Sequence, residues 1–176
     1  MMQIMNKFVS SVAVATFLVA NCASSAEVII GPDSSFVALI GEIDGGAATQ
    51  LIDLFVSRPA IKIVILDSPG GSVYSALDIA LMVHRLGLNT YVPEDAYCAS
   101  ACSFIFLAGI ERLVEGRLGV HQFYGAEGDA ASVESGAQYV VSRILDAFEI
   151  FGVDWRVSKA MLTTSPDGRF VFNDWQ

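Results

Sequence analysis

The sequence predicts an α/β domain with a mostly parallel sheet, and three observations support this fold class. Residues 61–66 read IKIVIL, a nearly continuous apolar run of the kind found in a parallel strand buried on both faces. Apolar residues then recur at helical spacing over 73–86, and a further extended run follows at 89–92. This alternation of strand and helix is typical of parallel sheets with right-handed crossovers.

The other elements follow from periodicity and turn residues. Short strands are expected at 27–30 and 35–40, and the tail has a turn at 165–168 followed by the aromatic segment 169–172. Helices are expected at 47–57, from about 101 to 109, at 137–151 and, capped by Asp154, at 155–162. Residues 112–115 and 118–122 are expected to form a strand pair around Gly116, and residues 124–136, rich in glycine, alanine and acids, a mobile surface loop.

The first 26 residues have the features of an export signal. Lys7 is their only charge, residues 8–20 form an apolar run, and small residues stand at 24–26. We expect cleavage after Ala26, a periplasmic location and one mature domain over 27–176. The apolar run is shorter than the roughly 20 residues that span a bilayer, so no permanent membrane anchor is expected. Lipidation of Cys22 is not expected either, because Asn21 stands where a lipobox has a small residue.

The mature domain is strongly acidic. The 176 residues contain 10 Lys and Arg and 19 Asp and Glu, so removal of Lys7 leaves 9 against 19, a formal charge of −10. Such a domain has no electrostatic reason to bind nucleic acid or anionic lipid, although a weak attraction for basic substrates follows from its charge.

The join between an extended run and a helix at 97–103 is the main candidate for chemistry. Ser100 stands there between two alanines, where the free N–H groups of a helix start favour the anion formed when a hydroxyl attacks a carbonyl. The simpler interpretation of Ser100 is a helix N-cap. Cys98 and Cys102 flank it symmetrically; in an exported protein they are a disulfide candidate, and two reduced, buried cysteines are the alternative.

Three motifs in order resemble the proteolytic subunit of Clp protease. They are SPGGSV at 68–73 after a buried strand, Ser100 shortly before Ala108-Gly109, and His121-Gln122 at the end of a later strand. Together with the signal sequence and CASAC at 98–102, they make the chain most similar to exported Clp-protease-like proteins of bacteria. The resemblance implies the ClpP/crotonase-like fold, with repeated β-β-α units and a mostly parallel sheet.

The resemblance also implies roles for individual residues. Ser100 matches the nucleophile, His121 the general base, and Gly71 and Ala101 the residues whose backbone N–H groups form an oxyanion hole. Asp167 is the best match to the acid that orients the histidine. Asp154 and Asp174 stay open as alternatives for that acid, and Asp167 before a glycine also fits an ordinary turn residue.

The function expected from these matches is that of an exported serine hydrolase, most simply a peptidase acting on peptides or proteins. No cofactor is needed, self-assembly is implied, and export excludes a cytosolic ATPase partner. A metal site has little support from two histidines, and His84 lies outside any motif. Lys159 could act as the base in a Ser-Lys dyad, as in signal peptide peptidase A, but it lies in no motif and has less support as the base than His121.

Two other functions compete with the hydrolase. The first is an inactive Clp-protease-like binding or assembly protein of the cell envelope, which stays open because the family continues past the position of Gln176. The second is an acyl-CoA enzyme of the same superfamily, which is disfavoured because CoA is cytosolic and such enzymes do not use a Ser-His pair.

Overall fold

The computed structural model describes residues 25–123, 130–165, 168 and 170–172. The strands are β1 (Glu27–Ile30), β2 (Phe36–Ile40), β3 (Ile63–Asp67), β4 (Asn89–Val92), β5 (Tyr97–Ala99), β6 (Arg112–Val114), β7 (Arg117–Val120) and β8 (Phe170–Phe172). The helices are α1 (Gly45–Ser57), α2 (Val73–Arg85), α3 (Ala101–Leu107), α4 (Ala130–Ile150) and α5 (Trp155–Thr163).

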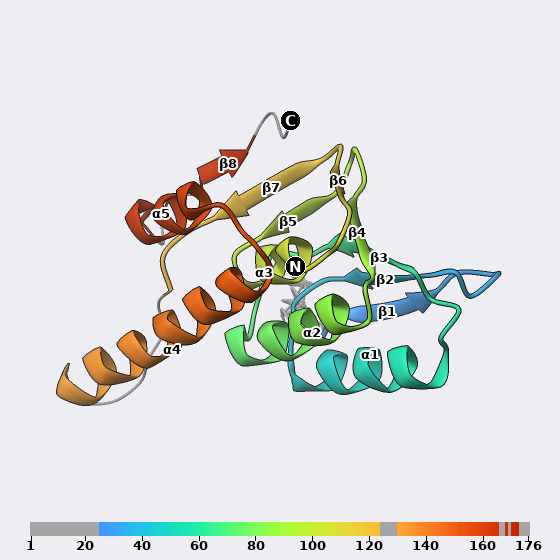
Figure 1. The fold of residues 1–176 in the computed structure, drawn as a ribbon, viewed down its shortest axis with the longest axis horizontal. Coiled ribbons are helices and arrows are strands. Elements are labelled where there is room, and N and C mark those ends of the chain that lie inside the picture. The colour runs from blue at the N-terminus through green and yellow to red at the C-terminus, as the bar shows by residue number, and fades with distance from the viewer. Residues whose placement is uncertain (1–24, 124–129, 166–167, 169, 173–176) are drawn as a thin grey trace, which may run out of the picture.

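The strands form two sheets, as Figure 1 shows. The larger has the order β1-β2-β3-β4-β6, with β1 antiparallel to β2 and every other pair parallel. The smaller has the order β5-β7-β8, with β5 parallel and β8 antiparallel to β7. The prediction of an α/β fold with a mostly parallel sheet is confirmed.

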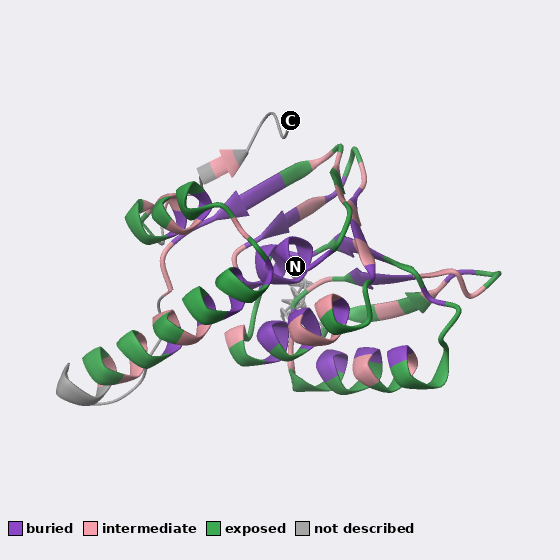
Figure 2. Ribbon diagram, viewed as in Figure 1, coloured by how far each residue is buried: buried purple, intermediate pink, exposed green. Residues whose placement is uncertain are grey.

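The core lies between the larger sheet and the helices. Its fully buried side chains include Leu39 and Leu66 from the sheet and Ile105 and Phe106 from α3. All seven residues of α3 are buried, which explains why that helix has no polar face in the sequence. Figure 2 shows α3 and the central strands as the buried centre, with exposed residues along the outer faces of α1, α4 and α5.

The expected strand pair around Gly116 is wrong. β6 joins the larger sheet beside β4, whereas β7 joins the smaller sheet beside β5, so the two strands do not pair with each other. The reason is that residues 112–120 follow residues 90–99 in parallel through both sheets. Gly116 marks the crossing, where a Cβ atom would lie 2.2 Å from the Pro93 carbonyl oxygen.

The boundary of the long helix was also predicted incorrectly. Residues 130–136, expected to belong to a surface loop, form the first two turns of α4, and the rest of that expected loop, 124–129, lies outside the described residues. A glycine inside a helix costs about 1 kcal/mol relative to alanine, so Gly136 does not interrupt a 21-residue helix. Figure 1 shows this end of α4 extending away from the sheets.

The first two described residues, Ser25 and Ala26, contact Glu42. Ser25 bridges to Glu42, and buried Ala26 donates its N–H to the Glu42 carbonyl oxygen at 2.8 Å. Cleavage after Ala26 would remove these contacts, while the pairing of β1 with β2 from Glu27 onward would stay. The expected signal sequence lies outside the described residues except for its last two positions. Among the helices of the described part, none is long and apolar enough to cross a membrane.

Candidate active site

Ser100 occupies a strained backbone position between β5 and α3. Its φ is +56° and its ψ is −128°, a conformation that side-chain-bearing residues rarely adopt and that costs on the order of 1–3 kcal/mol. It stands at the N-cap position, yet its side chain makes no capping hydrogen bond in the described structure. Helix capping therefore does not explain this serine, and strain of this kind concentrates at functional sites.

The segment that precedes α2 is held beside β5 by backbone pairing. The Ser68 N–H donates to the Tyr97 carbonyl oxygen at 2.6 Å, and the Ala99 N–H donates to the Ser68 carbonyl oxygen at 3.1 Å. The Asp67 carboxylate accepts from the Tyr97 N–H at 3.0 Å. These three bonds fix the end of β3 against β5 and thereby bring the Gly70-Gly71 pair to Ser100.

The two glycines are required by close approaches and by positive φ values. At Gly70, φ is +108°, and a Cβ atom would lie 2.7 Å from the Ser100 Cβ and 3.1 Å from the Ala101 nitrogen. At Gly71, φ is +138°, and a Cβ atom would lie 2.3 Å from the Ile43 carbonyl oxygen. No other residue type fits either position without movement of the backbone.

The directions of two backbone N–H groups follow from their peptide planes. The Gly70 carbonyl accepts from the Ile43 N–H at 2.8 Å, so the Gly71 N–H, on the other side of the same trans peptide, points away from Ile43. The Ser100 carbonyl accepts from the Ser103 N–H at 3.0 Å inside the first turn of α3. The Ala101 N–H therefore points out of the helix start. Each N–H is thus directed away from the partner of its own peptide carbonyl.

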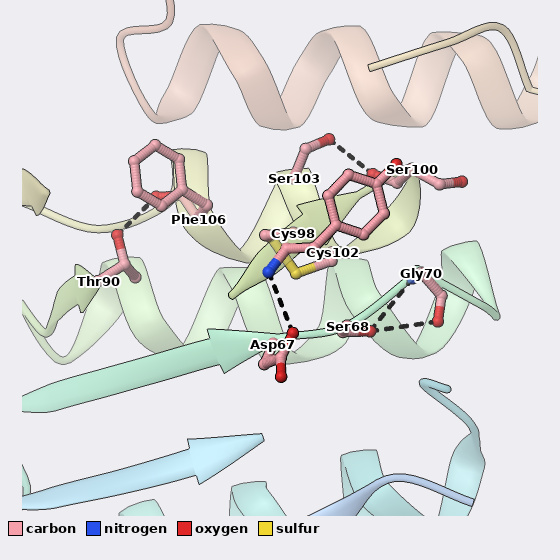
Figure 3. The surroundings of a disulfide bond; sticks show 10 residues. Asp67, Ser68, Gly70, Thr90, Cys98, Ser100, Cys102, Ser103 and Phe106 are labelled. Atoms are coloured by element: carbon pink, nitrogen blue, oxygen red, sulfur yellow. Dashed lines mark hydrogen bonds between the residues drawn. A yellow bond between two sulfur atoms is a disulfide. The ribbon is translucent and has the colours of Figure 1, made fainter. Parts of the chain in front are cut away.

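A disulfide joins the two ends of the turn that contains Ser100. Cys98 in β5 and Cys102 in α3 are bonded, with their Cα atoms 5.3 Å apart, and both are fully buried. Buried Ser103 adds a second restraint, because its hydroxyl donates to the Ser100 carbonyl oxygen at 2.6 Å. Figure 3 shows the disulfide and these polar contacts around the turn. The strained backbone at Ser100 is thus restrained from both sides.

His121 follows β7 and is held at the edge of the same turn. It is only 8% exposed, and its Nδ1 lies 2.7 Å from the backbone carbonyl oxygen of Gln122. Since a carbonyl oxygen only accepts, this contact places a proton on Nδ1. Gln122 is fixed in turn, because its N–H donates to Thr164 and its side chain to Leu162, both carbonyl oxygens.

Ser100 and His121 lie on the wall of one cavity of about 540 Å³. This volume is within the range of small-ligand and substrate clefts. The described residues that line it come from the end of β2, the SPGG segment and α2, the turn at Ser100, and the end of β7: Glu42, Pro69, Gly70, Gly71, Ser72, Val73, Tyr74, Ser100, Phe104, His121, Gln122 and Phe123.

The other residues considered from sequence lie elsewhere or outside the described part. Lys159 sits over the Trp155 ring at 5.6 Å, and His84 contacts the Ala108 carbonyl oxygen at 3.2 Å; neither lines the cavity. Asp154 caps α5 and pairs with Arg156 at 2.8 Å. Asp167 and Asp174 lie outside the described residues, which contain no group of three potential metal ligands.

Three contributors to the site were not identified from sequence. Ser68 accepts the Gly70 N–H at 3.1 Å and so shapes the glycine turn, Ser103 holds the Ser100 carbonyl, and Glu42 lines the cavity. The SPGGSV motif includes Ser68, so its position was visible. The contact of Ser103 lies within the first turn of α3, three residues from Ser100, and was not foreseen. The role of Glu42 depends on pairing between segments distant in the chain, and local sequence does not show such pairing.

Comparisons with known proteins agree with the architecture. No protein-family model matches the chain, and no curated protein matches it. Among solved structures, an asparagine-to-aspartate mutant of ClpP1 from Listeria monocytogenes is similar over 80% of this chain and 83% of its own, with 21% identity and a TM-score of 0.62. At this identity the likeness concerns three-dimensional structure rather than activity. The chain therefore has a ClpP-like fold.

Proposed function

We propose that this protein is an exported serine hydrolase of the peptidase type, with Ser100 as nucleophile and His121 as general base. One observation supports this most directly: Ser100 is held at φ +56°, without a capping bond, on the wall of the cavity that also contains His121. A serine that only caps the helix does not need such a conformation. In a nucleophile the sharp turn presents the hydroxyl to substrate.

The chemistry follows from the assigned tautomer. The Ser100 hydroxyl attacks the substrate carbonyl carbon, and its proton passes to His121 Nε2, while Nδ1 keeps its own proton. Collapse of the tetrahedral intermediate breaks the bond to the leaving amine, which takes the proton from Nε2. Water then attacks the acyl group on Ser100 by the same route, and the acid product leaves with Ser100 regenerated.

The negative oxygen of the intermediate requires hydrogen-bond donors. We assign this role to the N–H groups of Gly71 and Ala101, which point away from their own secondary structure beside Ser100. Loss of one such donor typically costs 100- to 1000-fold in rate. Because both donors are backbone groups, their placement depends on the turn geometry at Gly70 and Ser100 rather than on side chains.

Asp167 is proposed as the acid that orients His121, a role in which its carboxylate replaces the Gln122 carbonyl as acceptor of the Nδ1–H. It stands shortly before β8, which pairs with the strand that precedes His121. Asp154 is less suitable, because its carboxylate already caps α5 and pairs with Arg156. The two candidates for the orienting acid are distinguished by comparing how Asp167→Asn and Asp154→Asn change the reactivity of Ser100.

The experiment is intact-mass analysis of the purified protein after treatment with a small neutral fluorophosphonate. The proposal predicts one adduct, lost in Ser100→Ala and formed at least 10-fold more slowly in His121→Gln. Two matched controls are available. Ser34→Ala removes the other serine with positive φ in the described part of the chain, and His84→Gln removes the other histidine. Both should label at the wild-type rate.

The inactive binding or assembly protein remains the alternative function. Absence of any adduct on wild-type protein, in each oligomeric state that can be separated, would favour it. Hydrolysis of a peptide or simple ester that disappears in Ser100→Ala would exclude it. No observation on the cavity favours an acyl-CoA enzyme.

Export and self-assembly belong to the same proposal. Export fits a buried disulfide, which persists in oxidising compartments. N-terminal sequencing of protein from the periplasmic fraction should give Glu27 as the first residue. Assembly fits the exposed apolar residues Tyr139 and Ile150 on α4, each 57% exposed. Light scattering after gel filtration should give the mass of two or more chains rather than that of one.

A further inference from the structure

The cavity wall contains one charged residue in the described part of the chain, Glu42. Its position is set by backbone pairing: the Gly41 N–H donates to the Asp67 carbonyl oxygen at 2.9 Å and the Ile43 N–H to the Gly70 carbonyl oxygen at 2.8 Å. Ile43 is buried in the core, whereas Glu42 is exposed. The same strand pairing that brings the glycines to Ser100 therefore also places a carboxylate beside the cavity.

Among the described residues, the Glu42 carboxylate is not committed to a structural contact. Within residues 25–123, 130–165, 168 and 170–172 it makes no hydrogen bond or ion pair, and the salt bridge found there is between Arg156 and Asp154. The contact from Ala26 is made to the backbone carbonyl oxygen of Glu42 and does not involve the carboxylate. A carboxylate placed by rigid backbone and left without a cation suits recognition of a charged ligand.

Aromatic side chains line the same wall. Tyr74 is 54% exposed, and Phe104 and Phe123 also border the cavity. Aromatic faces attract cations and also pack against the methylene groups of long basic side chains. Acidic, aromatic and nucleophilic groups thus surround one space, and the net formal charge of −9 adds a general attraction for cations.

We propose that Glu42, with these aromatic rings, selects substrates that carry a cationic group next to the bond attacked by Ser100. This deepens the proposed hydrolase function and rests on it. Such a cationic group can come from two parts of a substrate: the side chain of a lysine or arginine, or the free α-ammonium group of a peptide. A contact of this kind near the surface favours the cation by about fivefold over a neutral isostere.

The test uses diphenyl phosphonates, in which the serine oxygen bonds to phosphorus and phenol leaves. Four probes are compared: lysyl and norleucyl side chains, each with an acetylated or a free amine. The rate of adduct formation on Ser100 is followed by intact mass in wild type, Glu42→Gln and Asp53→Asn. Asp53 is an exposed acid of α1 that does not line the cavity, so this control makes the same change in net charge.

Ratios within one protein remove general effects of the substitution. In wild type, the acetylated lysyl probe should react about fivefold faster than the acetylated norleucyl probe, and this ratio should fall toward one in Glu42→Gln but not in Asp53→Asn. If the α-ammonium is the recognised group, the free-amine norleucyl probe shows the Glu42-dependent advantage instead. Either pattern supports the proposal.

Failure of this inference differs from failure of the proposed function. If a neutral fluorophosphonate labels wild-type Ser100 while both cation ratios are the same in wild type and Glu42→Gln, the hydrolase proposal stands and the role of Glu42 is overturned. If no probe labels wild type, both proposals are overturned.

Discussion

Gly70 packs against Ser100 so closely that a Cβ atom on residue 70 would lie 2.7 Å from the Ser100 Cβ. The same atom would lie 2.9 Å from the Ala99 carbonyl oxygen, which belongs to β5 and cannot move independently. The contact therefore couples the SPGG segment to the strained turn. Any substitution that separates these two residues also separates the proposed oxyanion donors.

The first prediction concerns Gly70→Ala. It forces a side chain into φ +108° and against backbone atoms, so we expect destabilisation of about 2–4 kcal/mol and at least 10-fold slower labelling of Ser100. The control is Gly87→Ala, where φ is +65° and a Cβ atom would meet nothing within 4 Å. It should cost about 1 kcal/mol with no change in labelling. Equal labelling rates in the two variants would contradict the coupling.

The second prediction separates strain from chemistry at Ser100. Because glycine adopts φ +56° and ψ −128° without penalty, Ser100→Gly should be more stable than Ser100→Ala by about 1 kcal/mol or more. Both variants should lose labelling. Urea denaturation of the two proteins measures the difference, and Ser34→Gly against Ser34→Ala shows the ordinary effect at φ +58° on the surface. A Ser100→Ala variant as stable as Ser100→Gly would mean that the turn is not strained.

Local sequence was sufficient for most elements of the larger sheet and its helices. β4 and the start of α2 lie where the pattern placed them, because apolar runs and a serine cap specify them within a few residues. The ClpP-like fold was recognisable from motifs at 68–73, 100 and 121–122, and the structure brings those motifs together on one cavity.

Long-range pairing accounts for what the sequence did not predict. Residues 112–114 and 117–120 are suitable as a hairpin by composition, but pairing with β4 and β5 separates them into two sheets. The strained φ at Ser100 was not predicted either; Gly70, which packs against Ser100 from a distant segment, is the long-range part of its surroundings. The same holds for Glu42, which becomes part of the site only through pairing of residues 41–43 with residues 67–72.

The third prediction concerns the disulfide. Closing a loop this short by a covalent bond is worth about 2 kcal/mol in the chain-entropy account, so Cys98→Ala combined with Cys102→Ala should lower the free energy of unfolding by about that amount. Relaxation of the Ser100 turn should slow labelling by a larger factor than this loss of stability explains. A folded double variant with wild-type labelling would show that the disulfide stabilises the domain without positioning Ser100.

Reduction of the Cys98–Cys102 disulfide in the wild-type protein provides a second test of whether this bond positions Ser100. A reductant strong enough to open the bond, confirmed by mass after thiol alkylation, should slow labelling in wild type and leave the double variant unchanged. Because both cysteines are fully buried, opening should be slow under native conditions and faster in low concentrations of urea.

The fourth prediction concerns pH and the identity of the orienting acid. The side-chain hydrogen bond from Arg156, followed by the bond from its backbone N–H, lowers the pKa of Asp154 to about 2. A carboxyl whose pKa is lower in the folded state stabilises it above the unfolded pKa of 3.8, and this contribution is lost as pH falls toward 2. Asp154→Asn, which can still cap α5, should therefore be less stable than wild type at pH 6, and the difference should vanish near pH 2.

At neutral pH the same variant tests the assignment of the acid. Asp154 acts at the start of α5, whereas Gln122 beside His121 is held by carbonyl groups at the other end of that helix. Asp154→Asn should therefore leave the rate of Ser100 labelling within about twofold of wild type, since a charge lost at an exposed cap has a small effect. Asp167→Asn should slow labelling by more than 10-fold if it orients His121. The reverse order would transfer the role of orienting acid to Asp154, which would then have to exchange Arg156 for His121 as its partner.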